Sequence, residues 1–175
     1  SFSYTKADFD IDWSPVSKTT SEEEGYIAET QYLIKSDIFK VVSGIGYFDS
    51  DREDLDIISP WPPWASESKV RHTNIYVYTS INYPKNVIWS IGGSADFFEG
   101  GFLDLEVDQF NPKFGLTWSP FPTTTLRAAA FRTLKRSLIS NQTLEPTQVA
   151  GFNQFFDDGT GADAWRYGIG IDQKL

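Results

Sequence analysis

Strict alternation of apolar and polar residues runs through most of this sequence and is its strongest constraint on the fold. From Asn74 to Tyr83, one side of the segment carries bulky apolar residues such as Ile75 and Val77, and the other carries Asn74 and Tyr76. A period of two is typical of β-strands, because successive side chains point to opposite faces of a sheet. The period near 3.6 that is typical of helices is almost absent. The sequence therefore predicts an all-β fold.

The same alternation recurs in four further segments, at 39–48, 87–97, 110–118 and 165–172. In each, the second face holds mainly small and polar residues, and a face of that composition cannot form a packed core by itself. Counting the alternating stretches gives eight strands, at about 2–13, 25–35, 39–49, 71–83, 87–97, 105–118, 124–134 and 165–174. The segment Thr147–Phe156 is a further candidate for a strand or a hairpin.

The connections between these strands alternate between short and long. Short turns are expected at 36–38, 84–86 and 119–123, and long loops at 14–24, 50–70, 98–104 and 135–164. Transmembrane barrels of the bacterial outer membrane show this asymmetry, with short periplasmic turns and long extracellular loops. We therefore predict an antiparallel, up-and-down transmembrane β-barrel of about eight strands, with residues 1–175 forming a single barrel domain or a segment of a larger barrel.

Aromatic residues flank both ends of the predicted strands, as they do in the two interfacial girdles of such barrels. The expected members are Phe39, Tyr83, Trp89, Trp118 and Phe121 beside the short turns, and Tyr47, Phe97, Phe110 and Trp165 at the other end.

Composition excludes several other classes of protein. The net charge is −9, with 15 Lys and Arg against 24 Asp and Glu, so the chain lacks the surplus of cations that nucleic-acid binding needs. It has no Cys and a single histidine, His72, which excludes zinc ribbons, iron–sulfur clusters, cysteine nucleophiles and multi-histidine metal sites. No apolar run approaches the roughly 20 residues of a membrane-spanning helix. We expect no cofactor and no bound metal.

Three late segments resemble a known family. They read NPKFGLTW at 111–118, LRAAAFRTLKR at 126–136 and EPTQVAGFNQFFDD at 145–158. Their order and spacing are similar to those of the late strands of TonB-dependent receptors. They are more similar still to the C-terminal barrel of tetratricopeptide-repeat outer-membrane proteins of Gram-negative bacteria. The resemblance is good over about 105–175 and looser over 25–54.

This resemblance implies that the protein lies in the bacterial outer membrane, in contact with the lipid bilayer and lipopolysaccharide. It leaves room for a periplasmic repeat domain or a plug in the parent chain. The chain has no Met, and its last strand does not end on the aromatic residue usual in such barrels. We therefore expect a segment of a larger barrel, with a complete small barrel as the alternative.

Cationic side chains are candidates for contacts with a ligand. Those predicted to lie on the polar face are Lys35, Lys40, Lys113, Arg127 and Lys174. Among them, Lys40, Lys113 and Arg127 would attract an anionic solute into a pore. The alternative is that the cations pair with carboxylates on the same face, such as Glu29 and Asp172.

Two tryptophans are the other candidates. Trp61 and Trp64 flank a stiff Pro-Pro pair and would offer stacking faces to a sugar or a peptide, or alternatively clamp the rim of the barrel. The carboxylates of the predicted long loops would attract cations or simply keep the loops solvated, and none has the spacing of a calcium-binding loop.

A catalytic role for His72 would need a serine or aspartate beside it, and the candidates are Ser66, Ser68, Asp51 and Asp96. No spacing motif of a catalytic triad is present, and we expect no enzymatic activity. The predicted function is transport, or ligand uptake or export, of a small solute or polysaccharide across the outer membrane. Two alternatives stay open: a non-conducting outer-membrane barrel that binds through its surface, and a soluble ligand-binding β-barrel.

Overall fold

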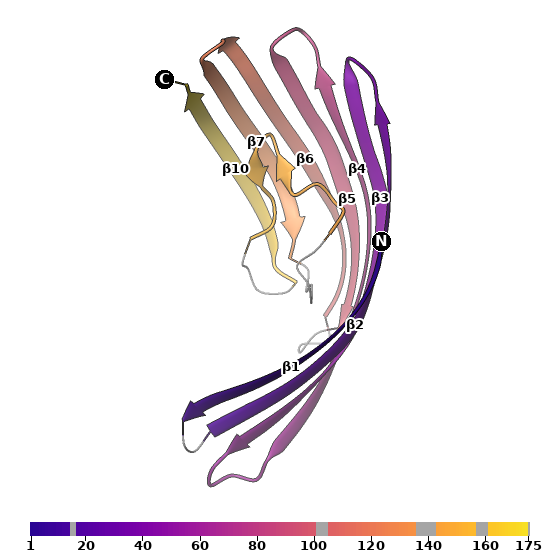
Figure 1. Ribbon diagram of the computed structural model, residues 1–175, viewed down its shortest axis with the longest axis vertical. Helices are drawn as coiled ribbons and strands as arrows, with labels where there is room; N and C mark the ends of the chain where they lie inside the picture. The colour runs from indigo at the N-terminus through magenta and orange to yellow at the C-terminus, as the bar shows by residue number, and fades with distance from the viewer. Residues whose placement is uncertain (15–16, 101–104, 136–142, 157–160, 175) are drawn as a thin grey trace.

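The structure, a computed structural model, describes residues 1–14, 17–100, 105–135, 143–156 and 161–174. They form an antiparallel sheet of eight strands in the order β1-β2-β3-β4-β5-β6-β7-β10, and a separate hairpin of β8 and β9 (Figure 1). The strands of the sheet are β1 (Phe2–Ser14), β2 (Ser17–Lys35), β3 (Phe39–Ile58), β4 (Trp64–Asn82), β5 (Val87–Gly100), β6 (Leu105–Phe121), β7 (Thr124–Leu134) and β10 (Asp163–Gln173). The hairpin consists of β8 (Gln148–Val149) and β9 (Phe152–Asn153). The predicted all-β, up-and-down fold is confirmed.

The sheet is curved but open. Each strand of the sheet pairs with its neighbours in chain order, and β10 pairs with β7. Among the described residues β1 and β10 are the two edges and do not pair with each other, so the predicted closure is not present. Figure 1 shows the strands curving through part of a circle, with β1 to β4 sweeping away from β10 at one end.

Strands β2, β3 and β4 are much longer than expected, at 19, 20 and 19 residues. The long loops predicted at 14–24 and 50–70 are therefore wrong over most of their length, since β2 begins at Ser17 and β3 continues to Ile58. In these stretches polar residues occupy both faces, so the alternation that reveals a half-buried strand is lost while the backbone pairing continues. We call the paired stretches 6–14 of β1, 17–24 of β2, 50–58 of β3 and 64–70 of β4 the extension.

The other predicted connections agree better with the structure. The strand pairs β2–β3, β4–β5 and β6–β7 are joined by short turns, where Ser36 N donates to Phe39 O and Val87 N to Pro84 O. Of the loop expected at 98–104, residues up to Gly100 belong to β5, and 101–104 lie outside the described residues. Within 135–164, the segment Thr147–Phe156, a candidate for a strand or a hairpin, forms the hairpin of β8 and β9.

The two faces of the sheet have the reverse burial of a water-soluble β-sandwich. The face that carries Ile45, Ile75 and Ile91, here called the apolar face, is exposed, with Ile75 at 50%. The opposite face, here called the polar face, is covered, and its Asn74 and Asn111 are 1% and 0% exposed. Most bulky apolar side chains therefore point away from the molecule, and polar side chains are covered together with two small apolar clusters, one around Phe48 and Phe98 and one around Phe131.

Hairpin β8–β9 covers part of the polar face and lies within the curve of the sheet (Figure 1). Its two-residue turn, Ala150-Gly151, has φ angles of 48° and 82°, which suit a type I′ turn. Glycines in the sheet allow the close approach: a Cβ at Gly115 would lie 2.8 Å from the Cβ of Ala150, and one at Gly168 would lie 2.7 Å from the Phe152 ring. The small residues of the polar face thus make room for the hairpin.

Candidate functional site

The segment 143–156, which contains the hairpin, is tied to β2 at its start. The carboxylate of Glu29 accepts hydrogen bonds from Thr143 Oγ1 at 2.7 Å and from the Leu144 amide at 2.9 Å. Gln31 donates its side-chain amide to the carbonyl of Leu144. The alternative interpretation of the polar-face cations gave Glu29 as a partner for them, whereas in the structure the two oxygens of Glu29 accept these two contacts from the segment.

A second attachment joins the segment to β4 through Glu145. This buried carboxylate accepts hydrogen bonds from Asn74 Nδ2 at 2.9 Å and from the Tyr78 hydroxyl at 2.5 Å. The Tyr78 hydroxyl in turn accepts a bond from Gln154 Nε2 at 3.0 Å. Hydrogen bonds to a charged group contribute about 1.5–3 kcal/mol each, so Glu145, which is buried, is a main attachment of the segment together with Glu29.

Arg127, a predicted ligand contact, is engaged by two neighbours on the polar face. Its guanidinium donates two hydrogen bonds to Asp172, at 2.7 and 3.0 Å, and lies 5.3 Å from the centre of the Phe152 ring. The alternative prediction, that Arg127 pairs with Asp172, is therefore confirmed. These contacts give Arg127 a role in seating the hairpin.

Lys40 and Lys113, the other two predicted cationic contacts, line one cavity of about 210 Å³ between the segment and the sheet. Its wall also includes Tyr78, Ser80, Ser90 and Gln148. Lys113 is 3% exposed and donates to the carbonyl of Arg132 at 2.6 Å, whereas Lys40 is exposed. The structure thus joins lysines from β3 and β6 that are far apart in sequence.

Trp61 and Trp64 lie elsewhere. Both are exposed, beside the turn between β3 and β4, at the tip of the extension. Ser80, the residue paired with Lys40, lies sixteen positions after Trp64 along β4, and at about 3.3 Å per residue this is roughly 50 Å along the strand. The tryptophans and the lysines therefore belong to different sites.

His72 is part of a buried polar network that the sequence revealed only in part. Its Nε2 lies 3.0 Å from Asp96 Oδ1, and the other oxygen of Asp96 accepts bonds from Ser94 Oγ at 2.9 Å and Asn111 Nδ2 at 2.6 Å. Gln109 continues the network by donating to Asn111 at 2.6 Å. Of the four predicted neighbours of His72, Asp96 is in contact.

The remaining predicted neighbours of His72 are Ser66 and Ser68 on the extension of β4, and Asp51 on the opposite face, bound to Lys69. Ser94 donates to Asp96 rather than to the histidine, so the geometry is not that of a triad. Asn111 and Gln109 were missed. The only sequence signal for them is that they occupy alternate positions of β6 on the same face as Asp96.

On the apolar face, the predicted aromatic girdles are exposed and aligned across strands. Phe39 pairs through Ile81 with Trp89, and Tyr47 pairs through Thr73 with Phe97. The two rows lie eight residues apart, which is about 27 Å along the strand and roughly 20 Å along the barrel axis for strands tilted by about 40°. This is close to the height of about 25 Å of the apolar band that outer-membrane barrels present to lipid.

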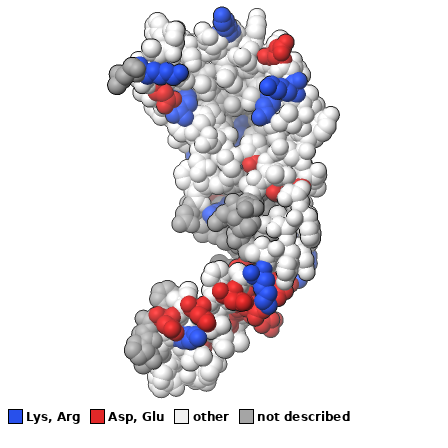
Figure 2. All heavy atoms as spheres, viewed as in Figure 1, with Lys and Arg blue, Asp and Glu red and all other residues white. Residues whose placement is uncertain are grey.

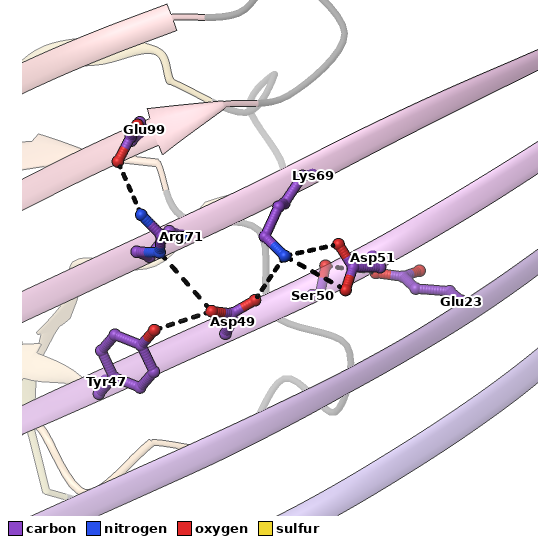
Figure 3. A network of polar contacts seen from close by, with 8 residues as sticks. All are labelled: Glu23, Tyr47, Asp49, Ser50, Asp51, Lys69, Arg71 and Glu99. Carbon is purple, nitrogen blue, oxygen red and sulfur yellow. Dashed lines mark hydrogen bonds and ion pairs between the residues drawn. The ribbon is translucent and has the colours of Figure 1, made fainter.

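A charged network lies immediately beyond the Tyr47 row (Figure 3). The Tyr47 hydroxyl donates to Asp49 at 2.8 Å, and Arg71 bridges Asp49, at 3.6 Å, and Glu99, at 3.3 Å. Lys69 bridges Asp49 and Asp51, at 3.8 and 3.1 Å, and these carboxylates raise the pKa of its ammonium group. The apolar band therefore ends at a line of ion pairs, as expected for a boundary with water.

A groove of about 710 Å³ runs along the apolar face between β5 and β10. Its floor includes Ala128 and Ala130 of β7, and larger side chains form its sides: Trp89, Ile91, Phe114, Leu116, Tyr167 and Ile169. The alternation of small and large residues across neighbouring strands hollows the face.

Acidic side chains gather over the extension, which forms the lower arm in Figure 2. Lys6 of β1 forms ion pairs there with Glu22 and Glu24 of β2. The described ranges contain no group of three or more acidic or histidine residues placed to hold a metal ion. They also contain no helix long and apolar enough to cross a membrane.

The pairing of Lys6 with Glu24 predicts a measurable pKa change. Chiefly through a hydrogen bond at 2.8 Å, Lys6 lowers the pKa of the Glu24 carboxyl below its ordinary value. The pair therefore stabilises the extension above the ordinary carboxyl pKa, and the contribution is lost as pH falls through the lowered pKa. In Lys6→Gln, NMR titration should show the pKa of Glu24 rising toward its ordinary value.

Lys18→Gln is the matched control, because Lys18 pairs with Asp10 rather than with Glu24. It should raise the pKa of Asp10, which Thr20 and Lys18 lower, and leave that of Glu24 unchanged. Equal titration of Glu24 in all three proteins would contradict the assigned pairing.

Comparison with known proteins places the fold. No protein-family model and no curated protein matches this chain. The solved structure titled "Structure of the FpvAI-pyocin S2 complex" is similar over 89% of this chain and 23% of that chain, with a TM-score of 0.53 and 15% identity. The protein matched there is a TonB-dependent receptor, FpvA. The likeness is to an outer-membrane β-barrel fold. At this identity it shows the fold alone, over less than a quarter of that chain.

Proposed function

We propose that this chain is an outer-membrane β-barrel, or a segment of one, that takes part in transport or ligand uptake or export across the outer membrane. The observation that carries the proposal is the reversed burial of the sheet, with polar residues covered and an apolar face exposed. In water an exposed apolar face of this extent is unfavourable, whereas lipid stabilises it. The receptor-like fold supports the same assignment.

Contact with lipid explains the details of the apolar face. The aromatic rows are spaced to lie at the two interfaces of a bilayer, and the ion pairs of Asp49, Lys69 and Arg71 begin where the apolar band ends. The groove over Ala128 and Ala130 is apolar and open along the sheet, and we propose that lipid acyl chains occupy it.

The open edges have a consequence in the bilayer. Backbone groups of an unpaired strand have no water to bind there, so every edge must be paired. Ile169 of the edge strand β10 is 89% exposed, because the side chains of this strand have a neighbouring strand on one side only. We propose that β1 and β10 pair in the membrane, with each other or with further strands of a longer chain.

A second candidate, a non-conducting barrel that binds its ligand without a free channel, is favoured by one observation. Segment 143–156 occupies the polar face and is held there through Glu29 and Glu145. Such a segment narrows any passage along that face. If a ligand binds at the segment and then displaces it from the polar face, the same protein would first bind and then conduct its ligand.

We also propose that the protein has no enzymatic activity of its own. His72, the residue best suited to general acid or base chemistry, is 2% exposed and bound to Asp96. Asp96 is itself saturated by donors from Ser94 and Asn111. These contacts support a structural role for the network.

Flotation with phospholipid vesicles tests the proposal. The purified chain, folded in detergent and mixed with vesicles, should float with the lipid after detergent removal. Its tryptophan fluorescence should be quenched by lipids brominated on their acyl chains, since Trp89 and Trp165 lie on the apolar face. A protein that stays in the aqueous fraction without detergent would contradict the membrane assignment and favour a soluble barrel. Uptake of small solutes into vesicles that contain the inserted protein then distinguishes a conducting barrel from a non-conducting one.

A further inference from the structure

We infer that the cavity between segment 143–156 and the sheet is a binding site for a small anion that carries carboxylate or phosphate groups. The cavity of about 210 Å³ lies on the polar face and is lined by Lys40 and Lys113. The inference rests on the proposed function in one respect, that the ligand reaches this face through the interior of the barrel.

The first argument is an uncompensated pair of cations. Lys35 and Lys40 are directly opposite each other in the register of β2 and β3, so their side chains share the polar face. Like charges in this arrangement are destabilising. Within the part of the chain that the structure describes, neither lysine has an ion-pair partner, although the chain as a whole is acidic. A bound anion would offset the repulsion.

The second argument is the row of donors that begins at this pair. Lys40 pairs with Ser80, and Ser80 pairs with Ser90. Three neighbouring strands, β3, β4 and β5, therefore each place a donor on the polar face in one cross-strand row. Ser90 then pairs with Gly115, above which the hairpin sits. Anions are bound by several converging N–H and O–H donors, which is what this row supplies.

The third argument is the position of Lys113. It is almost completely buried at the cavity wall, and its ammonium group donates to the carbonyl of Arg132. A cation held in a region shielded from water attracts an anion more strongly than one on the surface.

The size of the cavity limits the ligand. About 210 Å³ is roughly the liquid volume of seven water molecules, at about 30 Å³ each. Inorganic phosphate, pyrophosphate or a short dicarboxylate fits this space, and a polysaccharide does not. The inferred ligand is therefore a small free anion, or the anionic group of a larger solute.

Isothermal titration of the whole chain in detergent micelles tests the inference, with pyrophosphate and succinate as probes and glycerol as an uncharged control. The protein should bind at least one of the anions at low salt, with affinity falling as salt rises. Lys40→Gln should weaken binding by about 10-fold and Ser90→Ala by less. Because Lys40 is exposed, its replacement leaves the fold intact, which circular dichroism can verify.

Lys85→Gln is the matched control, since Lys85 lies in the turn between β4 and β5 and is not part of the cavity wall. Absence of anion binding in the unaltered protein would overturn the inference, as would equal affinity of Lys40→Gln and Lys85→Gln. Failure of the chain to float with vesicles while anion binding persists would overturn the proposed function but not this site. Flotation without anion binding would do the reverse.

Discussion

Replacing Val77 by arginine is expected to destabilise the protein in a lipid bilayer by about 2–4 kcal/mol. Val77 lies on the apolar face of β4, midway between the two aromatic rows, which cross this strand at Thr73 and Ile81, and it is already half exposed. In a bilayer this position faces the hydrocarbon, where a charged side chain is costly. In water the same substitution at an exposed strand position would change stability by at most about 0.5 kcal/mol. Urea unfolding in phospholipid vesicles, followed by tryptophan fluorescence, measures the difference.

Leu55→Arg provides the control on the same face. Leu55 of β3 is exposed to a similar extent, but it lies on the extension, beyond the ion pairs of Asp49 and Asp51. Its replacement is expected to cost less than about 0.5 kcal/mol, because the position faces water. If the two variants are equally stable in vesicles, the band between the aromatic rows is not in contact with lipid.

The strands of this band could be predicted from the sequence because each of them separates two environments. At Ile75, Val77 and Ile81 of β4, an apolar residue recurs at every second position, and polar or smaller residues occupy the positions between. That contrast exists only where one face meets lipid or a core and the other does not. The short turns were predictable for the same reason, since the alternation stops on both sides of them.

The extension could not be predicted in this way because both of its faces meet water. Glu22, Glu53 and Glu67 occupy one cross-strand row, and the residues beside them in the sequence are mostly polar or charged too. The alternation of apolar and polar residues that identifies a strand is therefore missing. Backbone pairing and ion pairs such as that of Lys6 with Glu24 continue the strands there. A run of acidic residues reads as a loop when only the sequence is considered, and the acidic stretch 50–70 was misread for that reason.

The candidate site was partly predictable. The polar-face position of Lys40 and Lys113 follows from the alternation in β3 and β6, and Thr147–Phe156 could be recognised as a candidate for a strand or a hairpin. The cavity itself did not follow, because it exists only where segment 143–156 folds back onto the sheet. The close approach of Gly115 to Val149 and Ala150 of the hairpin brings together residues whose proximity no sequence pattern indicates.

Replacing Glu145 by alanine is expected to release segment 143–156 from the polar face. The change leaves the Asn74 amide and the Tyr78 hydroxyl without their carboxylate acceptor. Loss of hydrogen bonds to a charged group costs about 2–3 kcal/mol here, which corresponds to roughly a 30- to 150-fold increase in the population of the detached segment. Hydrogen exchange of the peptide containing Leu144, whose amide donates to Glu29, should accelerate by the same factor.

Glu67→Ala is the control, because Glu67 is an exposed carboxylate on the extension of β4. It should leave exchange of the segment unchanged. Tyr78→Phe removes one of the two donors to Glu145 and also the acceptor of the Gln154 side-chain amide. Because the bond between Tyr78 and Glu145 is lost in either variant, the effect of the double substitution should be smaller than the sum of the two single effects. A full sum would mean that Tyr78 holds the segment through Gln154 and not through Glu145. If exchange is fast already in the unaltered protein, the segment does not close the polar face, and the cavity at Lys40 and Lys113 would then be open to the interior of the barrel.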